Sequence, residues 1–254
     1  MFKPFTVFVL FFITDAFAKP SILLPLYVYP ENNLWQPFYN AIKAFPSVKF
    51  DVIVNPENGP GNGKYPDGDY ISGVAKLRAF PNVRIIGYVY TSYCKRNAAQ
   101  VNADVNKYAN WKTYTKANIS IDGIFYDEVS ESSKVVTYLK GLTDYSRSVI
   151  PKSYNVLNPG TNVPKTFYNV SDNIVFFESP WSQFNSNQLT QIKGLESKSS
   201  IIIHTFTGTD AIQQLTVTKW AAAGISSIYI TTAADYDSVS TKWIQLCAAV
   251  ANTK

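Results

Sequence analysis

Residues Ile121 to Glu128 read Ile-Asp-Gly-Ile-Phe-Tyr-Asp-Glu, a mostly apolar run that ends in two adjacent carboxylates. Such a run of β-branched and aromatic residues, here Ile121 to Asp127, is typical of a strand buried in a parallel sheet. Seven similar runs occur along the chain. They are Ile22 to Tyr29, Val48 to Asn55, Val83 to Tyr90, Ser153 to Leu157, Ile174 to Glu178, Ile201 to Thr205 and Ser227 to Thr231.

Helix-like segments alternate with these runs. They are Leu34 to Ala44, Tyr70 to Ala79, Ala98 to Lys116, Val135 to Val149, Ser186 to Lys193, Asp210 to Ala223 and Ser238 to Ala251, with a single turn at Pro164 to Tyr168. The repeat of about 30 residues is the size of a βαβ unit. Alternating strands and helices favour a parallel sheet covered by helices, and eight units favour closure of that sheet. We therefore predict the α/β fold class, as a single (β/α)8 TIM-type barrel.

The composition narrows the function classes. The chain has 254 residues, of which 46% are hydrophobic, 16% are charged and one is histidine. The apolar fraction excludes a disordered chain. One histidine makes a zinc site improbable and leaves a single base for a Ser-His triad. The net charge of +5 is spread along the sequence without a basic block, which disfavours a nucleic-acid partner. We expect no metal and no cofactor.

The N-terminus is predicted to be a secretory signal peptide. Lys3 precedes an apolar stretch, and Ala16-Phe17-Ala18 fits a cleavage site. The expected organisation is a signal peptide at 1–18 and a barrel domain at 19–254. The mature chain is then a protein without a membrane span, secreted to the extracellular space or the cell wall. Asn118 and Asn169 begin possible glycosylation sequons, and the two cysteines, Cys94 and Cys247, could be paired or free.

The carboxyl ends of barrel strands are where such enzymes place their chemistry. Asp127, Glu128 and Glu178 each follow a strongly apolar run. The fourth and sixth strands lie about 10 Å apart along a sheet, so side chains that converge inward suit the paired carboxylates of glycoside hydrolysis. Asp127 and Glu128 point to opposite faces on a regular strand, and the sequence leaves open which is the main catalytic group. The alternative is that single members cap helices or form ion pairs.

Polar and aromatic side chains at the same strand ends are candidates for substrate binding. Asn155 and Asn158 lie at the end of the fifth strand, and we assign Asn155 to the substrate. The other tryptophans, Trp35, Trp111, Trp220 and Trp243, fall within helix patterns and are expected to pack in the core. The predicted substrate-binding set is Tyr27, Asn55, Tyr88, Tyr93, Asn155, Trp181 and His204.

Four segments, in order along the chain, resemble the spherulin 4 (spherulation-specific) family. They are 24–30, 52–61, 87–93 and 123–128, read as LPLYVYP, VIVNPENGPG, GYVYTSY and GIFYDE. The resemblance implies a secreted (β/α)8 glycoside hydrolase that cuts α-1,4-linked N-acetylgalactosamine in galactosaminogalactan. It also implies that Asp127, Glu128 and Glu178 are the catalytic residues. Cys94 stands where the family pattern suggests glycine.

The leading hypothesis is therefore a monomeric, endo-acting glycoside hydrolase with a polysaccharide substrate. A non-catalytic polysaccharide-binding protein of a cell wall or spore coat is the alternative, and an esterase ranks third because only one histidine is present. The sequence leaves retaining, inverting and substrate-assisted mechanisms open.

Overall fold

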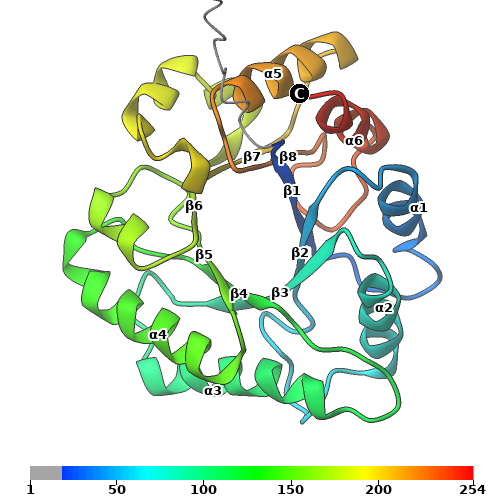
Figure 1. Ribbon diagram of the computed structural model, residues 1–254, viewed down its shortest axis with the longest axis vertical. Coiled ribbons are helices and arrows are strands. Elements are labelled where there is room, and N and C mark those ends of the chain that lie inside the picture. The colour runs from blue at the N-terminus through cyan, green and yellow to red at the C-terminus, as the bar shows by residue number, and fades with distance from the viewer. Residues whose placement is uncertain (1–18, 254) are drawn as a thin grey trace, which may run out of the picture.

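The computed structural model describes residues 19–253, so the predicted signal peptide at 1–18 lies outside the described residues. Eight parallel strands close into a barrel in the order β1 to β8, and helices surround it (Figure 1). β1 pairs with both β2 and β8, which completes the ring. The predicted (β/α)8 barrel is confirmed.

The strands follow the apolar runs closely. Their bounds are β1 Ser21–Leu26, β2 Phe50–Val54, β3 Val83–Tyr90, β4 Gly123–Asp127, β5 Tyr154–Leu157, β6 Asn173–Pro180, β7 Ser199–His204 and β8 Ser227–Ile230. Almost every strand residue is buried, because the barrel interior covers one face of the sheet and the helices cover the other. This explains why the runs are continuously apolar rather than alternating.

Six α-helices form most of the outer layer. They are α1 Gln36–Ala44, α2 Gly68–Arg78, α3 Ala98–Asn110, α4 Val136–Val149, α5 Asp210–Ala222 and α6 Trp243–Ala251. Three of these helices have an N-cap side chain that accepts a hydrogen bond from a backbone N–H group of the first turn. The caps are Asp67 at α2, Asn97 at α3 and Thr209 at α5. These caps lie in loops that follow strands, so they position the loops at the barrel mouth.

Short 3-10 helices replace α-helices after β5 and β6. The segment predicted as a helix at 186–193 is a 3-10 helix over Ser186–Ile192, and the single turn expected near 164–168 is one over Lys165–Asn169. Asn185 caps the first of these through a capping box with Gln188. This region packs against the barrel through aromatic side chains rather than through an amphipathic α-helix.

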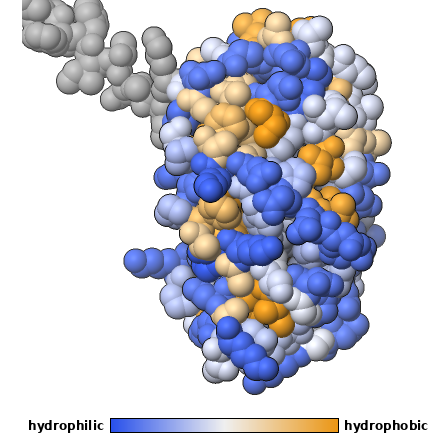
Figure 2. Space-filling model, turned by 90° about the vertical axis from the view of Figure 1, so that its right-hand side faces the viewer, coloured by the Kyte–Doolittle hydropathy of each residue, from blue (hydrophilic) through white to orange (hydrophobic). Residues whose placement is uncertain are grey.

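The tryptophans predicted to pack in the core do so: Trp35, Trp111, Trp220 and Trp243 are buried. Cys94 and Cys247 are both free thiols, which decides the question that the sequence left open. No helix within residues 19–253 is long and apolar enough to cross a membrane. On the face seen in Figure 2, apolar residues form small separate areas among polar ones, as on an ordinary solvent-facing layer.

Candidate active site

Two of the predicted carboxylates meet at the carboxyl ends of the strands. Asp127 is the last residue of β4, and Glu178 lies near the end of β6. Asn158, which directly follows β5, lies between them. Its Nδ2 atom is 2.7 Å from Asp127 Oδ1 and 2.6 Å from Glu178 Oε2. Both carboxylates therefore accept a hydrogen bond from one amide group.

Two tyrosines complete this network. The Tyr88 hydroxyl group donates to Asp127 Oδ2 over 2.8 Å, and the Tyr236 hydroxyl group donates to Glu178 Oε1. Each of the four carboxylate oxygens thus accepts a hydrogen bond from one of these side chains. Tyr27 packs edge-on against both tyrosine rings, with ring centroids 5.6 Å from Tyr88 and 5.7 Å from Tyr236. Strands β3, β4 and β6 and the segments after β1, β5 and β8 all contribute to this site.

The shared amide limits how far apart the two nearest carboxylate oxygens, Asp127 Oδ1 and Glu178 Oε2, can lie. Asn158 Oδ1 accepts from the Gly160 backbone N–H over 3.0 Å, so the nitrogen of the amide must face the carboxylates. Two oxygens bonded to one nitrogen can be no farther apart than the sum of the two distances, about 5.3 Å. A separation near 5 to 5.5 Å is typical of retaining glycosidases, and inverting enzymes need about 6.5 to 9.5 Å.

Burial raises the pKa of both carboxyl groups above their ordinary values. For Glu178 the neighbouring charge of Asp127 raises the pKa further, while the hydrogen bonds from Tyr236 and Asn158 lower it. For Asp127 three donors lower the pKa, namely the Glu128 backbone N–H, Tyr88 and Asn158. The charged form is therefore better stabilised on Asp127, and Glu178 is the better proton donor.

Glu128 lies in a strained part of the mouth. Its φ of 53° is in the left-handed region, so the chain leaves the regular strand directly after Asp127. Ser92, Tyr93 and Cys94, after β3, adopt positive φ in succession. The Thr91 hydroxyl group joins the two segments, because it lies 2.7 Å from the Glu128 carbonyl oxygen and accepts from the Cys94 N–H. Strained backbone of this kind is common at functional sites.

The other residues predicted to bind substrate lie on several strand ends and loops. Tyr93 is 62% exposed on the strained turn, and His204 ends β7 half-buried, with Nδ1 3.0 Å from the Thr205 hydroxyl oxygen. Burial lowers the pKa of His204, which favours its neutral form.

Trp181 lies three positions after Glu178. Its ring stacks on Phe184 and packs edge-on against Phe206. Asn55 uses its Oδ1 to accept from the Gly59 N–H and thus organises the loop after β2.

The structure contradicts the place assigned to Asn155. This residue is fully buried, and its Oδ1 accepts from Ser146 of α4 over 2.7 Å. Side chains alternate along a strand, so Asn155 faces the helical layer while Asn158, three positions later, faces the barrel axis. The amide at the site is therefore that of Asn158. Tyr236 was also missed, because it lies in an irregular loop after β8 that carries no periodic signal.

Metal binding finds no support in this region. Within residues 19–253, no group of three or more His, Cys, Asp or Glu side chains is placed to hold a metal ion. The arrangement that is present, a pair of buried carboxylates with hydroxyl and amide donors, is suited to proton transfer and nucleophilic attack.

The profile of the spherulation-specific family 4 matches residues 21–250, which is nearly the whole described chain. The chain belongs to this family. Within family 4, Spherulin-4 of Physarum polycephalum is 32% identical over 229 residues. That match covers 86% of this chain but only 65% of Spherulin-4, so the chain spans just under two thirds of its relative.

A solved structure shares the fold over nearly the whole chain. Sph3 of Aspergillus clavatus, in complex with GalNAc, is 30% identical and superposes with a TM-score of 0.87 over 92% of this chain and 98% of Sph3. GalNAc is thus a sugar that this structural relative binds. An α-L-fucosidase isoenzyme of Paenibacillus thiaminolyticus, 9% identical with a TM-score of 0.59, shares the fold over 92% of this chain and 48% of its own.

Proposed function

We propose that the chain is an endo-acting glycoside hydrolase that cleaves α-1,4-linked N-acetylgalactosamine in a galactosaminogalactan-like polysaccharide. The observation that carries the proposal is the Asn158 amide, which holds Asp127 and Glu178 at a spacing suited to a retaining mechanism. The sugar in the Sph3 complex, GalNAc, supports the choice of substrate class.

The two carboxylates take distinct roles. Asp127, whose charged form has three donors, attacks the anomeric carbon while the bond to the leaving oxygen breaks. Glu178 gives its proton to that oxygen. In the second step Glu178 takes a proton from water, the water oxygen bonds to the anomeric carbon, and the bond to Asp127 breaks. Glu178 is thereby protonated again, and both residues return to their starting states.

Aromatic and polar side chains around the pair would hold the sugars. Tyr27 and Tyr88 lie beside the carboxylates, and Tyr93, Trp181 and His204 lie on strand ends or loops of the same mouth. Aromatic rings are suited to the apolar faces of sugars. Glu128 is adjacent to Asp127 and its carboxylate accepts no hydrogen bond from the side chains of residues 19–253, so it is free to bind substrate. The natural site of action is the extracellular space or cell wall, after removal of residues 1–18.

The first test is cleavage of purified galactosaminogalactan, with product length measured by gel filtration. The parent chain should release a range of oligosaccharides, as expected for internal cuts. Glu178→Gln should reduce the rate at least about a hundredfold, because the leaving oxygen loses its proton donor. Glu131→Gln is the matched control, since Glu131 is exposed in the loop before α4. If the parent chain binds the polymer but does not shorten it, the result would favour the non-catalytic alternative.

The stereochemistry is a separate prediction. Because the carboxylate spacing fits a retaining enzyme, the first product should carry the α configuration. Proton NMR of early time points, before the reducing end equilibrates, reports the configuration directly. An initial β product would mean that water attacks in a single step, and the role of Asp127 as a nucleophile would then be wrong.

A further inference from the structure

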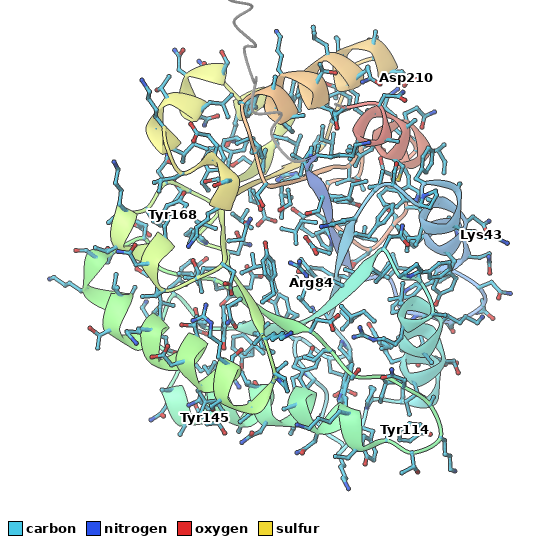
Figure 3. The ribbon with its side chains drawn as sticks, in the orientation of Figure 1. Lys43, Arg84, Tyr114, Tyr145, Tyr168 and Asp210 are labelled. Carbon is cyan, nitrogen blue, oxygen red and sulfur yellow. The ribbon has the colours of Figure 1, made fainter. Side chains whose placement is uncertain are left out.

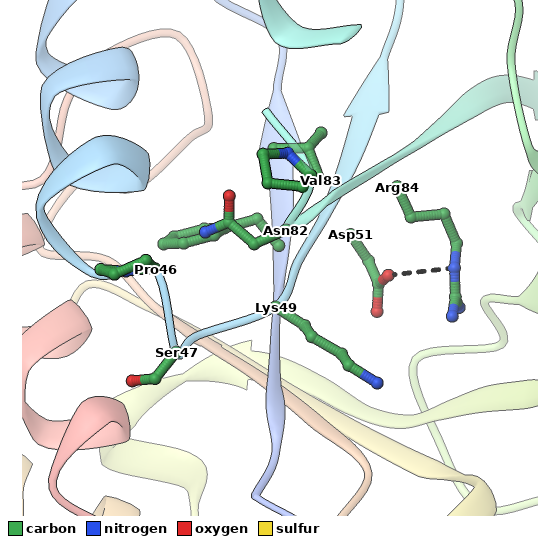
Figure 4. A pocket seen from close by; sticks show the side chains of 9 residues that line it. Pro46, Ser47, Lys49, Asp51, Asn82, Val83 and Arg84 are labelled. Atoms are coloured by element: carbon green, nitrogen blue, oxygen red, sulfur yellow. Dashed lines mark ion pairs between the residues drawn. The ribbon is translucent and has the colours of Figure 1, made fainter. Parts of the chain in front are cut away.

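Three adjoining cavities open at the opposite end of the barrel, where the strands begin. The largest, about 430 Å³, lies between the segments that enter β2 and β3 and includes Asp51 and Arg84 (Figure 4). A second, about 220 Å³, shares Lys49, Asp51 and Arg84 with it. A third, about 320 Å³, shares Arg84 with both. The shared residues make the three cavities one groove across the amino-terminal end of the barrel.

Positive charge dominates this groove. Its lining contains Lys19, Lys49, Arg78, Arg84 and Lys152 but only two carboxylates, Asp51 and Asp122. Both carboxylates are already paired. Arg78 lies 2.9 Å from Asp122, and Arg84 lies 3.5 Å from Asp51, which also accepts from the Ser21 hydroxyl group. Lys49 and Lys152 are exposed, and neither pairs with a carboxylate in the described part of the chain.

Arg84 is held in place at the centre of the groove. Figure 3 places it inside the ring of strands, whereas the other labelled residues lie in the outer layer. Its guanidinium lies over the Tyr154 ring, 3.8 Å from the centroid. Besides Asp51 and Tyr154, it has no partner within residues 19–253. A guanidinium has five N–H donors, so several remain for a ligand. Figure 4 shows the Lys49 and Arg84 side chains extending on the same side of the groove, around Asp51.

We propose that this groove is a second binding site, which takes an acidic polysaccharide through carboxylate or sulfate groups. A fixed guanidinium with spare donors binds such oxyanions in a bidentate manner. A single small ion would reach only part of the groove, whereas an extended chain with one charge per sugar could meet Arg84, Lys49 and Lys152 in turn. Pro46, Pro81 and Val83 provide apolar lining for sugar faces. The site lies at the far end of the barrel from Asp127, so a polymer held there leaves the mouth open.

The test is isothermal titration of the chain with oligogalacturonate, free galacturonate and inorganic phosphate at low salt. The parent should bind the oligosaccharide more tightly than either small anion. The Lys49→Gln/Lys152→Gln double variant should raise its Kd at least about tenfold. Both lysines are exposed and unpaired, so the variant should fold, and circular dichroism checks this. Cleavage of a short neutral substrate should be unchanged, which separates this site from the proposed function.

The matched control is Lys134→Gln/Lys165→Gln, which removes the same charge from exposed lysines outside the groove. It should leave the Kd for oligogalacturonate within about twofold of the parent value. An equal loss in both double variants would show that only net charge matters, and the proposal would fail. Equally tight binding of phosphate or free galacturonate would overturn the assignment to a polymer, and no binding by the parent would overturn the site itself.

Discussion

The Tyr236 hydroxyl group donates a hydrogen bond to the charged form of Glu178 and so lowers the proton affinity of that carboxyl group. This contact lowers the pKa of a carboxyl group that burial and the charge of Asp127 raise. Tyr236 itself stays neutral, because burial and the nearby charge of Glu178 raise the pKa of its phenol. A single hydroxyl group therefore tunes the proposed acid without supplying a proton.

Tyr236→Phe should move the alkaline limb of the pH profile of kcat/KM to higher pH. Without the hydrogen bond the charged form of Glu178 is less stable, so the protonated acid persists further into the alkaline range. The measurement is kcat/KM across about pH 4 to 9. Tyr145→Phe removes a hydroxyl group from the outer face of α4 and should leave the profile in place. If the alkaline limb of the kcat/KM profile lies at the same pH in Tyr236→Phe as in the parent, another group donates the proton.

At the scale of elements, the β4–β5 pair carries the site. Gly123 pairs with Tyr154 in register, and Asp127 and Asn158 follow from the far ends of the same two strands. A Cβ atom on Gly123 would lie 2.0 Å from the Tyr154 carbonyl oxygen, which is closer than any real contact. The strands can approach as they do only because residue 123 has no side chain.

Gly123→Ala should lower the free energy of unfolding by at least about 2 kcal/mol, because the strands must separate to admit the methyl group. Urea unfolding measures the loss. Gly141→Ala in α4 is the matched control, since nothing lies within 4 Å of the added atom. That change should leave stability unchanged or raise it by up to about 1 kcal/mol. Equal effects of the two substitutions would contradict the close approach of β4 and β5.

At the scale of the whole molecule, the barrel brings two half-buried carboxyl groups together at its mouth. Both Asp127 and Glu178 have a pKa raised by burial, so the folded chain binds their protons more tightly than the unfolded chain. Stability from these groups is therefore present at low pH and is lost as pH rises through the raised values. The carboxylate pair therefore lowers stability at neutral pH.

Glu178→Gln should consequently raise the melting temperature at pH 7. The gain should shrink as the pH falls through about 4 and disappear near about pH 3, where the parent carboxyl group is protonated in both the folded and the unfolded states. Thermal unfolding followed by circular dichroism at the two pH values makes the comparison. A gain of the same size at both would show that packing, rather than the buried charge, separates the two proteins.

Much of the barrel follows from local sequence patterns. Continuous apolar runs predict buried parallel strands, and each run lies on or directly beside the observed strand. Asp127 and Glu178 stand out in the sequence because a charge that ends such a run is unusual, and the structure brings both within hydrogen-bond distance of Asn158. Helix type was harder to predict after β6, where Ser186–Ile192 is a 3-10 helix rather than an α-helix.

By itself, the sequence determined the order of strands and helices and the strand ends that carry carboxylates, because both depend on local periodicity. Only the tertiary structure decided which neighbours meet there. Asn155 and Asn158 differ by three positions, so their side chains face opposite sides of the sheet, and strand register selects Asn158. Tyr236 reaches Glu178, 58 residues earlier, because β8 pairs with β7 and β7 pairs with β6, so the ends of these strands meet at the mouth. Contacts of that separation depend on how whole strands are arranged in the sheet, and no local pattern encodes them.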